Sequence, residues 1–151
     1  MTENHRIEYK RELTDNLEKE VVAFLNAREG GVLHIGIDDD GKTIGVQNFD
    51  QIQLIIKDRL RNNIRPSIMG LFEILHEKRD GKDTICLTVA GGLEKPYYLK
   101  KYGMTEKGCY LRIGSASEPM PQEMIEAFYG KRIRNTIGRI GNGKRVIVYD
   151  S

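Results

Sequence analysis

The chain lacks any long apolar run. No stretch of its 151 residues approaches the roughly 18 consecutive apolar residues that a membrane span requires, and residues 1–13 contain no apolar core of a secretion signal. We therefore expect a cytoplasmic protein without a membrane partner. A composition of 39% hydrophobic and 30% charged residues is typical of a soluble globular protein, and the length suits one domain.

Cysteine is scarce, and nucleotide-binding motifs are missing. Cys86 and Cys109 belong to no Cys-x-x-Cys pair and to no Cys/His spacing typical of zinc sites, so we expect two buried, reduced thiols. His34 lies inside an apolar stretch, which favours a core histidine over a ligand. The chain has no Walker motif and no G-x-G-x-x-G turn before a helix, which argues against nucleotide hydrolysis.

Net charge is also small, at +2, so overall charge does not by itself indicate binding to nucleic acid. The distribution of charge is uneven, however. From residue 131 onward a single acid, Asp150, accompanies six basic residues: Lys131, Arg132, Arg134, Arg139, Lys144 and Arg145. We expect residues 1–130 to form a domain and residues 131–151 a basic tail that contacts phosphates. The alternative is a solvated helix end whose cations complement the helix dipole.

Apolar periodicity predicts helices interspersed with hairpins. Helical spacing is found over residues 16–27, in a segment that starts at Asp50 and stops before Pro66, and in a segment that opens at Pro121. Strand patterns cover residues 5–10 and 109–113, and two hairpins join residues 32–37 to 43–46 and residues 68–78 to 82–89. This order predicts an α+β domain with a mixed or antiparallel sheet of hairpins and about three helices.

Acidic residues near two predicted strands match the donor set of a metal site. Glu8 shares a strand face with Lys10, and Asp38 and Asp39 follow the next strand. Carboxylates that converge on Mg²⁺ or Mn²⁺ allow the metal to polarise a phosphate and to activate water for phosphodiester cleavage. The alternative is that the aspartates form a hairpin turn and that Glu8 pairs with Lys10 or Arg11.

Interleaved lysines and tyrosines form a second candidate site. They are Lys95, Tyr97, Tyr98, Lys100, Lys101 and Tyr102. In proteins that bind single strands, cations hold phosphates and aromatic rings stack on bases, but the same composition suits a packed edge segment. Arg112, in a predicted strand before a Gly-Ser turn, is a further candidate for contacting phosphate, with a surface salt bridge as the alternative.

Six short segments occur in a distinctive order. They are IEYK at residues 7–10, VAFLN at 22–26, GGVLHIGIDD at 30–39, GKTIGV at 41–46, KPYYL at 95–99 and YLRIGS at 110–115. Together they resemble the Schlafen AlbA_2 family over roughly residues 3–130. The glycine-rich motif alone would be a weak signal, but the combination is specific.

The resemblance implies a DNA-binding module, as in prokaryotic regulators, or the core of a nuclease that cleaves transfer RNA and ribosomal RNA, as in some animal Schlafen proteins. In the nuclease branch, the acidic site falls by motif position on Glu3, Glu8 and either Asp38 or Asp39. The metal would be Mg²⁺ or Mn²⁺. Because the animal proteins pair two such lobes, the resemblance also suggests a homodimer, and the chain is either a stand-alone version or a fragment of a larger regulator.

We therefore expect a nucleic-acid-binding module, with a metal-dependent endoribonuclease acting on structured RNA as the alternative. A third interpretation is a domain that serves dimerisation alone. The residues expected to bind nucleic acid are Lys10, Arg11, Lys95, Tyr97, Tyr98, Lys100, Arg112, Lys131, Arg132 and Arg134. The expected metal ligands in the nuclease alternative are Glu3, Glu8 and Asp38. The choice between DNA and RNA stays open.

Overall fold

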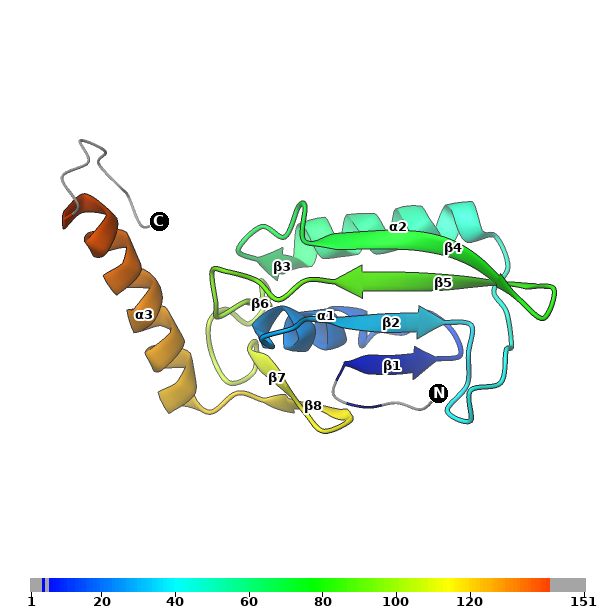
Figure 1. The fold of residues 1–151 in the computed structure, drawn as a ribbon, viewed down its shortest axis with the longest axis horizontal. Helices are drawn as coiled ribbons and strands as arrows, with labels where there is room; N and C mark the ends of the chain where they lie inside the picture. Colours follow the sequence, from blue (N-terminus) through cyan, green and yellow to red (C-terminus); the bar gives the residue numbers. More distant parts are fainter. Residues whose placement is uncertain (1–3, 5, 142–151) are drawn as a thin grey trace.

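The computed structural model describes residues 4 and 6–141, and a four-stranded sheet forms its centre. The strand order is β1 (Ile7–Lys10), β2 (Gly31–Ile35), β5 (Lys82–Val89) and β4 (Phe72–Arg79). β1 lies parallel to β2, whereas β5 is antiparallel to both β2 and β4. The helices α1 (Leu17–Asn26) and α2 (Phe49–Asn63) lie on one face of this sheet (Figure 1).

Shorter elements complete the fold beside α1. β3 (Ile64–Arg65) pairs with β6 (Tyr98–Leu99), and β7 (Tyr110–Ile113) forms a hairpin with β8 (Ala116–Pro119). β7 packs against α1. The helix α3 (Gln122–Gly141) begins after this hairpin and extends away from the sheet at one end of the molecule (Figure 1).

The main hydrophobic core lies between the sheet and its two helices. Its sheet side is formed by alternate residues of β2 and β5, namely Leu33, Ile35, Ile85, Leu87 and Val89. Every second residue of a strand points to the same face, so His34 of β2 and Cys86 of β5 lie on the face that α1 and α2 do not cover. A second, smaller cluster holds the start of α3 beside β7, and its buried members are Cys109, Met120 and Ile125.

α1 is buried along nearly its whole length. It lies between the sheet and the β7–β8 hairpin, and nine of its ten residues are buried. Its charged residues Glu18 and Glu20 are among them. A buried carboxylate requires a cationic or hydrogen-bonding partner, and the neighbouring elements supply one to each of these glutamates.

The α+β class with three helices and a mixed sheet is confirmed. The turn of Asp80 and Gly81 joins β4 to β5 with φ values of 52° and 74°, as two-residue hairpin turns require. The predicted hairpin between residues 32–37 and 43–46 is wrong, because β2 pairs with β1 and β5 and a single bridge joins Ile37 to Thr43. The chain turns sharply at Gly36, where φ is 101°, and does not continue a ladder.

α3 is longer than the sequence indicated. It continues through Gly130 to Gly141, so Lys131, Arg132 and Arg134 are helical residues and do not follow the last helix. A glycine inside a helix costs about 1 kcal/mol, which is too little to end a helix by itself. Residues 142–151, the rest of the expected tail, lie outside the described residues. Within residues 4 and 6–141, no helix has the length and apolar character needed to cross a membrane.

Candidate nucleic-acid interface

Arg112 of β7 lies at the centre of a buried charged cluster between α1 and β1. Its side chain is 1% exposed. Nη1 donates to Oε2 of Glu20 at 3.1 Å and to Oγ of Ser117 at 3.3 Å, and Nη1 and Nη2 each lie 3.5 Å from an oxygen of the Glu8 carboxylate. Nη2 also donates to the carbonyl oxygens of Asn4 and Ile7. The guanidinium group therefore ties β1 and α1 to the β7–β8 hairpin.

Lys10 completes this cluster. Its Nζ lies 3.8 Å from the Glu8 carboxylate and 3.9 Å from that of Glu20. Two cations thus balance two carboxylates, which is the condition under which buried charges are tolerated. We refer to Glu8, Lys10, Glu20, Arg112 and Ser117 as the Arg112 cluster. The sequence suggested that Arg112 contacts phosphate or forms a surface salt bridge. Both suggestions are wrong, because the side chain is almost inaccessible to solvent and its ion pairs are buried.

The predicted acidic residues have different partners in the structure. Glu8 is held by Arg112 and Lys10. Asp38 closes the turn after β2, since its Oδ1 accepts hydrogen bonds from the backbone amides of Asp40 and Lys42 at 3.0 and 2.9 Å. Asp39 is exposed, and Glu3 lies outside the described residues. The turn interpretation therefore accounts for Asp38, and the interpretation of Glu8 as the partner of Lys10 is correct.

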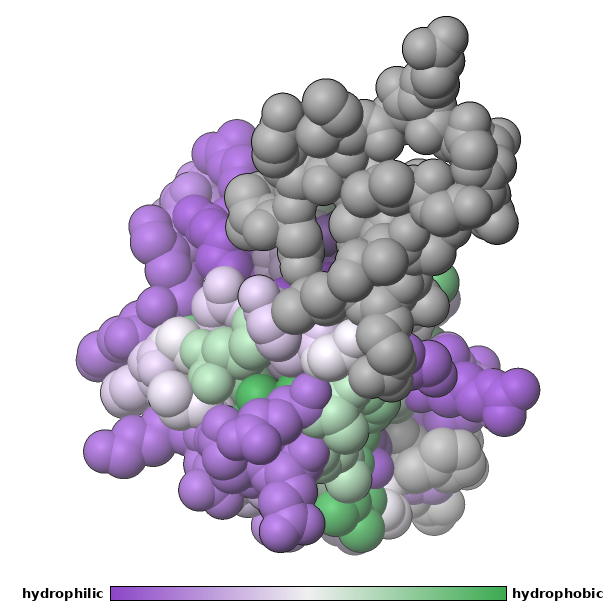
Figure 2. Space-filling model, turned by 90° about the vertical axis from the view of Figure 1, so that its left-hand side faces the viewer, coloured by the Kyte–Doolittle hydropathy of each residue, from purple (hydrophilic) through white to green (hydrophobic). Residues whose placement is uncertain are grey.

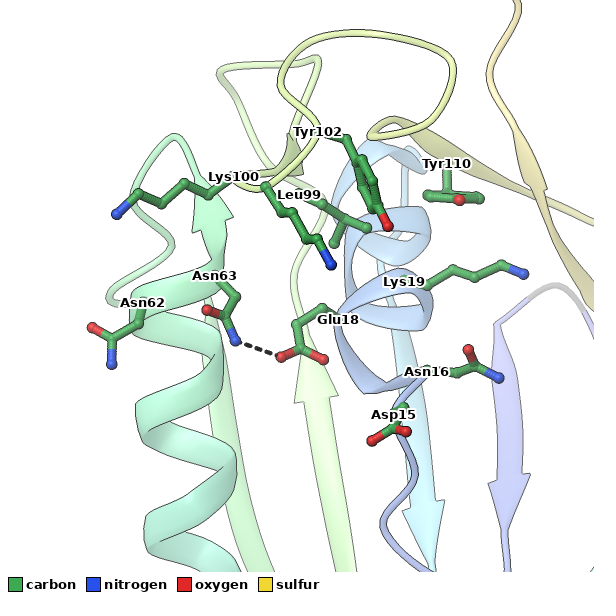
Figure 3. A pocket seen from close by; sticks show the side chains of 11 residues that line it. Asp15, Asn16, Glu18, Lys19, Asn62, Asn63, Leu99, Lys100, Tyr102 and Tyr110 are labelled. Atoms are coloured by element: carbon green, nitrogen blue, oxygen red, sulfur yellow. Dashed lines mark hydrogen bonds between the residues drawn. The ribbon is translucent and has the colours of Figure 1, made fainter.

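An open pocket lies beside the N-terminal half of α1. Its volume is about 820 Å³. It is lined by residues of α1 and of the two positions before it, by the end of α2 and by the segment from β6 to β7. The lining includes Asp15, Asn16, Glu18, Lys19, Asn62, Asn63, Lys100, Lys101, Tyr102 and Tyr110 (Figure 3). We refer to Lys19, Lys100, Lys101, Tyr102 and Tyr110 as the lysine–tyrosine pocket.

Cations and aromatic rings are neighbours in this pocket. The Lys19 ammonium lies 5.3 Å from the centre of the Tyr110 ring, and that of Lys101 lies 5.4 Å from the centre of the Tyr102 ring. Tyr102 is 45% exposed, and Lys100 and Lys101 are exposed as well. These lysines and nearly half of the Tyr102 side chain are therefore accessible to a ligand.

Glu18 forms one wall of the pocket and braces α1 against α2. Its carboxylate accepts hydrogen bonds from Nε and Nη2 of Arg59 and from Nδ2 of Asn63, the last at 2.7 Å (Figure 3). Burial alone would raise the pKa of the Glu18 carboxyl, but the hydrogen bonds from Arg59 and Asn63 lower that pKa below its ordinary value. The carboxylate thus stays ionised, and Arg59 neutralises its charge.

A second basic group forms where the segment before β6 meets α3. Burial and the neighbouring charges of Lys131 and Arg28 lower the pKa of Lys95, so each of these two cations lies close enough to Lys95 to repel it. Arg132 donates from Nη1 to the carbonyl oxygen of Glu94 at 2.7 Å. At the end of the molecule from which α3 leaves, hydrophilic side chains surround a smaller apolar patch (Figure 2). We refer to Arg28, Lys95 and Lys131 as the α3 basic group.

The predicted binding residues are thus divided among several places. Lys100 lines the pocket, Lys95 and Lys131 meet in the α3 basic group, and Arg11 is exposed beside a separate pocket. Tyr97 is 1% exposed, its hydroxyl accepts a hydrogen bond from the Glu94 amide, and its backbone amide donates to Asn26. The packing interpretation is therefore the correct one for Tyr97. Tyr98 is half-buried against the smaller cluster that contains Cys109 and Met120, and the side chain of Arg134 lies outside the described residues.

Several residues of these sites were not anticipated from the sequence, namely Lys19, Glu20, Arg28, Tyr110 and Ser117. Glu20 lies three positions after Leu17 and four before Phe24, within the apolar stripe of a predicted helix. A carboxylate on such a stripe is a signal of a buried ion pair, and this signal could have identified Glu20. Lys19 and Arg28 carry no comparable signal, because surface cations on helices are common and their roles here depend on distant segments.

Comparisons with known proteins address the fold and the family. The structure is similar to that of the DIP2311 protein from Corynebacterium diphtheriae, with a TM-score of 0.61 and 19% identity over 82% of this chain and 23% of that chain. It is also similar to the N-terminal domain of a protein from Nitrosomonas europaea named for its relation to the ATP-dependent DNA helicase RecG, with a TM-score of 0.54 and 24% identity over 77% and 82% of the two chains.

At these identities the two likenesses concern the fold alone, and this chain spans less than a quarter of the length of the DIP2311 chain. No curated protein gives a significant match. A model of the family described as Schlafen, AlbA_2 matches residues 3–121. That range contains both the Arg112 cluster and the lysine–tyrosine pocket. Because the match covers most of the chain, the chain belongs to the Schlafen AlbA_2 family.

Proposed function

We propose that the chain binds single-stranded nucleic acid and that the lysine–tyrosine pocket is its contact surface. Family membership points to a nucleic-acid-associated role, and the N. europaea neighbour is named for a DNA helicase. The observation that carries the proposal is the juxtaposition of exposed lysines with the accessible ring of Tyr102 in one open pocket. Proteins that bind single strands combine the same two features.

The chemistry of the pocket suits a nucleotide unit. Lys100 and Lys101 offer ammonium groups to phosphate oxygens, and Tyr102 offers its ring to a base. The amides of Asn62 and Asn63 add polar groups to the wall, although Asn63 already donates to Glu18. A volume of about 820 Å³ lies within the roughly 300 to 1,000 Å³ typical of pockets for small ligands. The α3 basic group supplies a further surface for the backbone of a longer strand.

The direct test is a fluorescence-anisotropy titration of labelled single-stranded DNA and RNA at several salt concentrations. The double variant Lys100→Gln with Lys101→Gln should bind more weakly. The negative slope of its log Kobs against log salt should become shallower by about 1.4, because each phosphate contact on a single strand contributes about 0.7. Lys57→Gln, an exposed lysine of α2 outside the pocket, is the matched control and should leave the slope unchanged.

Two outcomes would contradict this proposal at different levels. Equal slopes for the wild type and the double variant would show that the pocket is not the contact surface. Undetectable binding at low salt, or binding that does not depend on salt, would contradict nucleic-acid binding itself. Comparison of the DNA and RNA titrations decides which of the two nucleic acids is preferred.

Binding, and not cleavage, is the function that these contacts support. A metal ion at Glu8 would have to displace Arg112 or Lys10 from a buried carboxylate, and breaking a buried ion pair is costly. The endoribonuclease that uses Mg²⁺ or Mn²⁺ stays a prediction, tested by incubating structured RNA with each metal and with a chelator. The homodimer also stays a prediction, and analytical ultracentrifugation tests it.

A further inference from the structure

One face of the central sheet is not covered by α1 or α2 (Figure 1). Three residues with metal-binding side chains meet on this face, one from each of three adjacent strands. His34 of β2 lies directly opposite Cys86 of β5, and Cys86 lies opposite Leu75 of β4. Glu77 follows Leu75 by two positions on β4 and so shares its face. The strand register therefore brings an imidazole, a thiol and a carboxylate together.

The distances between the donor atoms are short enough for the three side chains to share one metal ion. One donor atom from each of His34, Glu77 and Cys86 can be chosen so that all three lie within 4.8 Å of one another. Donors bound to a tetrahedral zinc ion at about 2.0 to 2.3 Å are roughly 3.3 to 3.8 Å apart. The site therefore needs a contraction of about an ångström, which side-chain rotation in the half-buried Glu77 can supply.

The burial of this site provides an independent observation. His34 is 7% exposed and Cys86 is 8% exposed, and Nδ1 of His34 is buried without a hydrogen-bond partner among the described residues. A buried polar atom that lacks a partner destabilises the fold, because its lost hydration is not replaced. The sequence suggested a core histidine with its hydrogen bonds satisfied. The burial is correct, but one ring nitrogen is left available.

We propose that His34, Glu77 and Cys86 bind one Zn²⁺ ion, with a water molecule in the fourth position. Nitrogen, oxygen and sulfur donors of this kind are the ligands that zinc takes in proteins, and three protein ligands with one open position are typical of sites at which zinc retains water. The thiolate makes Mg²⁺ and Ca²⁺ poor occupants, because those ions prefer oxygen ligands. The site differs in ligands and in sheet face from the predicted acidic site at Glu8.

Charge and protons balance in this binding step. Burial, and then the charge of Arg79, lower the pKa of His34, so its imidazole is neutral and ready to donate a lone pair. Burial raises the pKa of the Cys86 thiol, so the S–H bond breaks as the zinc–sulfur bond forms and one proton passes to solvent. The thiolate and the Glu77 carboxylate then neutralise the two charges of the ion.

Cobalt provides a spectroscopic test that does not depend on any activity. The full chain is stripped of metal with a chelator and titrated with Co²⁺, which occupies nitrogen and sulfur sites of this kind. We expect a near-ultraviolet charge-transfer band from thiolate to cobalt that saturates at one ion per chain and disappears when Zn²⁺ is added. Cys86→Ser should abolish the band, whereas the matched control Cys109→Ser should retain it, because Cys109 lies in the separate cluster beside α3.

Zinc affinity, measured by competition with a coloured chelator, tests the other two ligands. His34→Gln and Glu77→Gln should each weaken binding by more than about 100-fold, since loss of an outer-shell partner alone costs roughly 10- to 100-fold. Lys78→Gln, whose side chain lies on the other face of β4, should leave binding unchanged. Circular dichroism is used to check that each variant is folded. If the His34 or Cys86 variant unfolds, the variant of the half-buried Glu77 still tests the site.

Several results would overturn the zinc site. These are the absence of a thiolate–cobalt band in the wild type, a band that persists in Cys86→Ser, or a zinc affinity that is the same for Glu77→Gln and the wild type. None of these measurements involves nucleic acid, so the zinc site and the proposed binding function can fail independently.

Discussion

The Arg112 cluster and the lysine–tyrosine pocket use similar charged residues for different purposes. Both depend on a glutamate of α1, and Glu18 and Glu20 lie about 200° apart around that helix, so they point to opposite sides of it. Glu20 meets Arg112 in a site that solvent barely reaches. Glu18 meets Arg59 at the wall of an open pocket in which further cations are exposed.

The two regions differ in how far their charged side chains are exposed to solvent. In the Arg112 cluster, two cations are matched to two carboxylates and all four charges are used to hold the fold together. In the pocket, Lys100 and Lys101 are exposed and accessible to a phosphate. A cation therefore serves stability where it is buried and paired, and serves recognition where it is exposed beside an aromatic ring.

The largest effect is expected at Arg112. Arg112→Met keeps most of the volume but leaves Glu8 and Glu20 buried with Lys10 as their one remaining cation, so the free energy of unfolding should fall by about 3 to 5 kcal/mol. Urea denaturation measures this change. The control Arg61→Met removes an exposed ion pair with Asp58 and should change stability by less than about 0.5 kcal/mol.

A second substitution in the Arg112→Met background tests whether Arg112 and Glu20 are energetically coupled. Adding Glu20→Gln removes one of the uncompensated charges, so part of the lost stability should return. If the double variant were as unstable as the sum of the two single variants, Arg112 and Glu20 would not be energetically coupled, and the description of the cluster as a paired unit would be wrong.

The tyrosines separate packing from recognition. Tyr97→Ala should lower the free energy of unfolding by about 3 to 5 kcal/mol, because it empties a core position. Tyr102→Ala should change stability by less than about 0.5 kcal/mol but should weaken binding to single strands by about 1 to 3 kcal/mol, the usual contribution of one stacked base. Thermal melts and anisotropy titrations on the same samples measure both quantities. A large loss of stability in Tyr102→Ala would place that ring in the core and not in the pocket.

The smallest effect concerns Glu18 and depends on pH. Because the folded protein lowers the pKa of this carboxyl, its hydrogen bonds stabilise the fold above the ordinary glutamate pKa and are lost as pH falls through the lowered value. Glu18→Gln should therefore reduce stability by about 1 to 2 kcal/mol at neutral pH, and the difference from the wild type should shrink as the pH drops below about 4.5. A difference that stays constant down to pH 3 would exclude this linkage.

The local elements could be predicted from the sequence because their signals are local. The spacing of Leu17, Val21 and Phe24 defined α1, and Asp80 with Gly81 defined the turn between β4 and β5. The pairing of β2 could not be inferred in the same way. A compact apolar strand suits either a hairpin or the centre of a sheet, and the choice depended on β5, whose residues lie about fifty positions further along the chain.

The candidate site was less predictable than the fold, because its geometry depends on which residues are buried. Tyr97 and Tyr102 occur in the same segment with the same neighbours, yet one is in the core and the other is on the surface. Arg112 and Lys100 are equally plausible phosphate ligands in the sequence, but only Lys100 is exposed. The difference arises from tertiary packing around α1, which no periodicity within one segment encodes.

The contacts of Arg112 also have a consequence for the order in which the domain folds. Its hydrogen bond to Asn4 joins residues 108 positions apart, and those to Glu8 and Glu20 join residues 104 and 92 positions apart. On a growing polypeptide, β1 and α1 are complete long before this arginine is synthesised, and their two carboxylates must stay hydrated until it arrives. We therefore expect the amino-terminal strand to dock late, and contacts of such long sequence separation to make folding slow for a protein of this size.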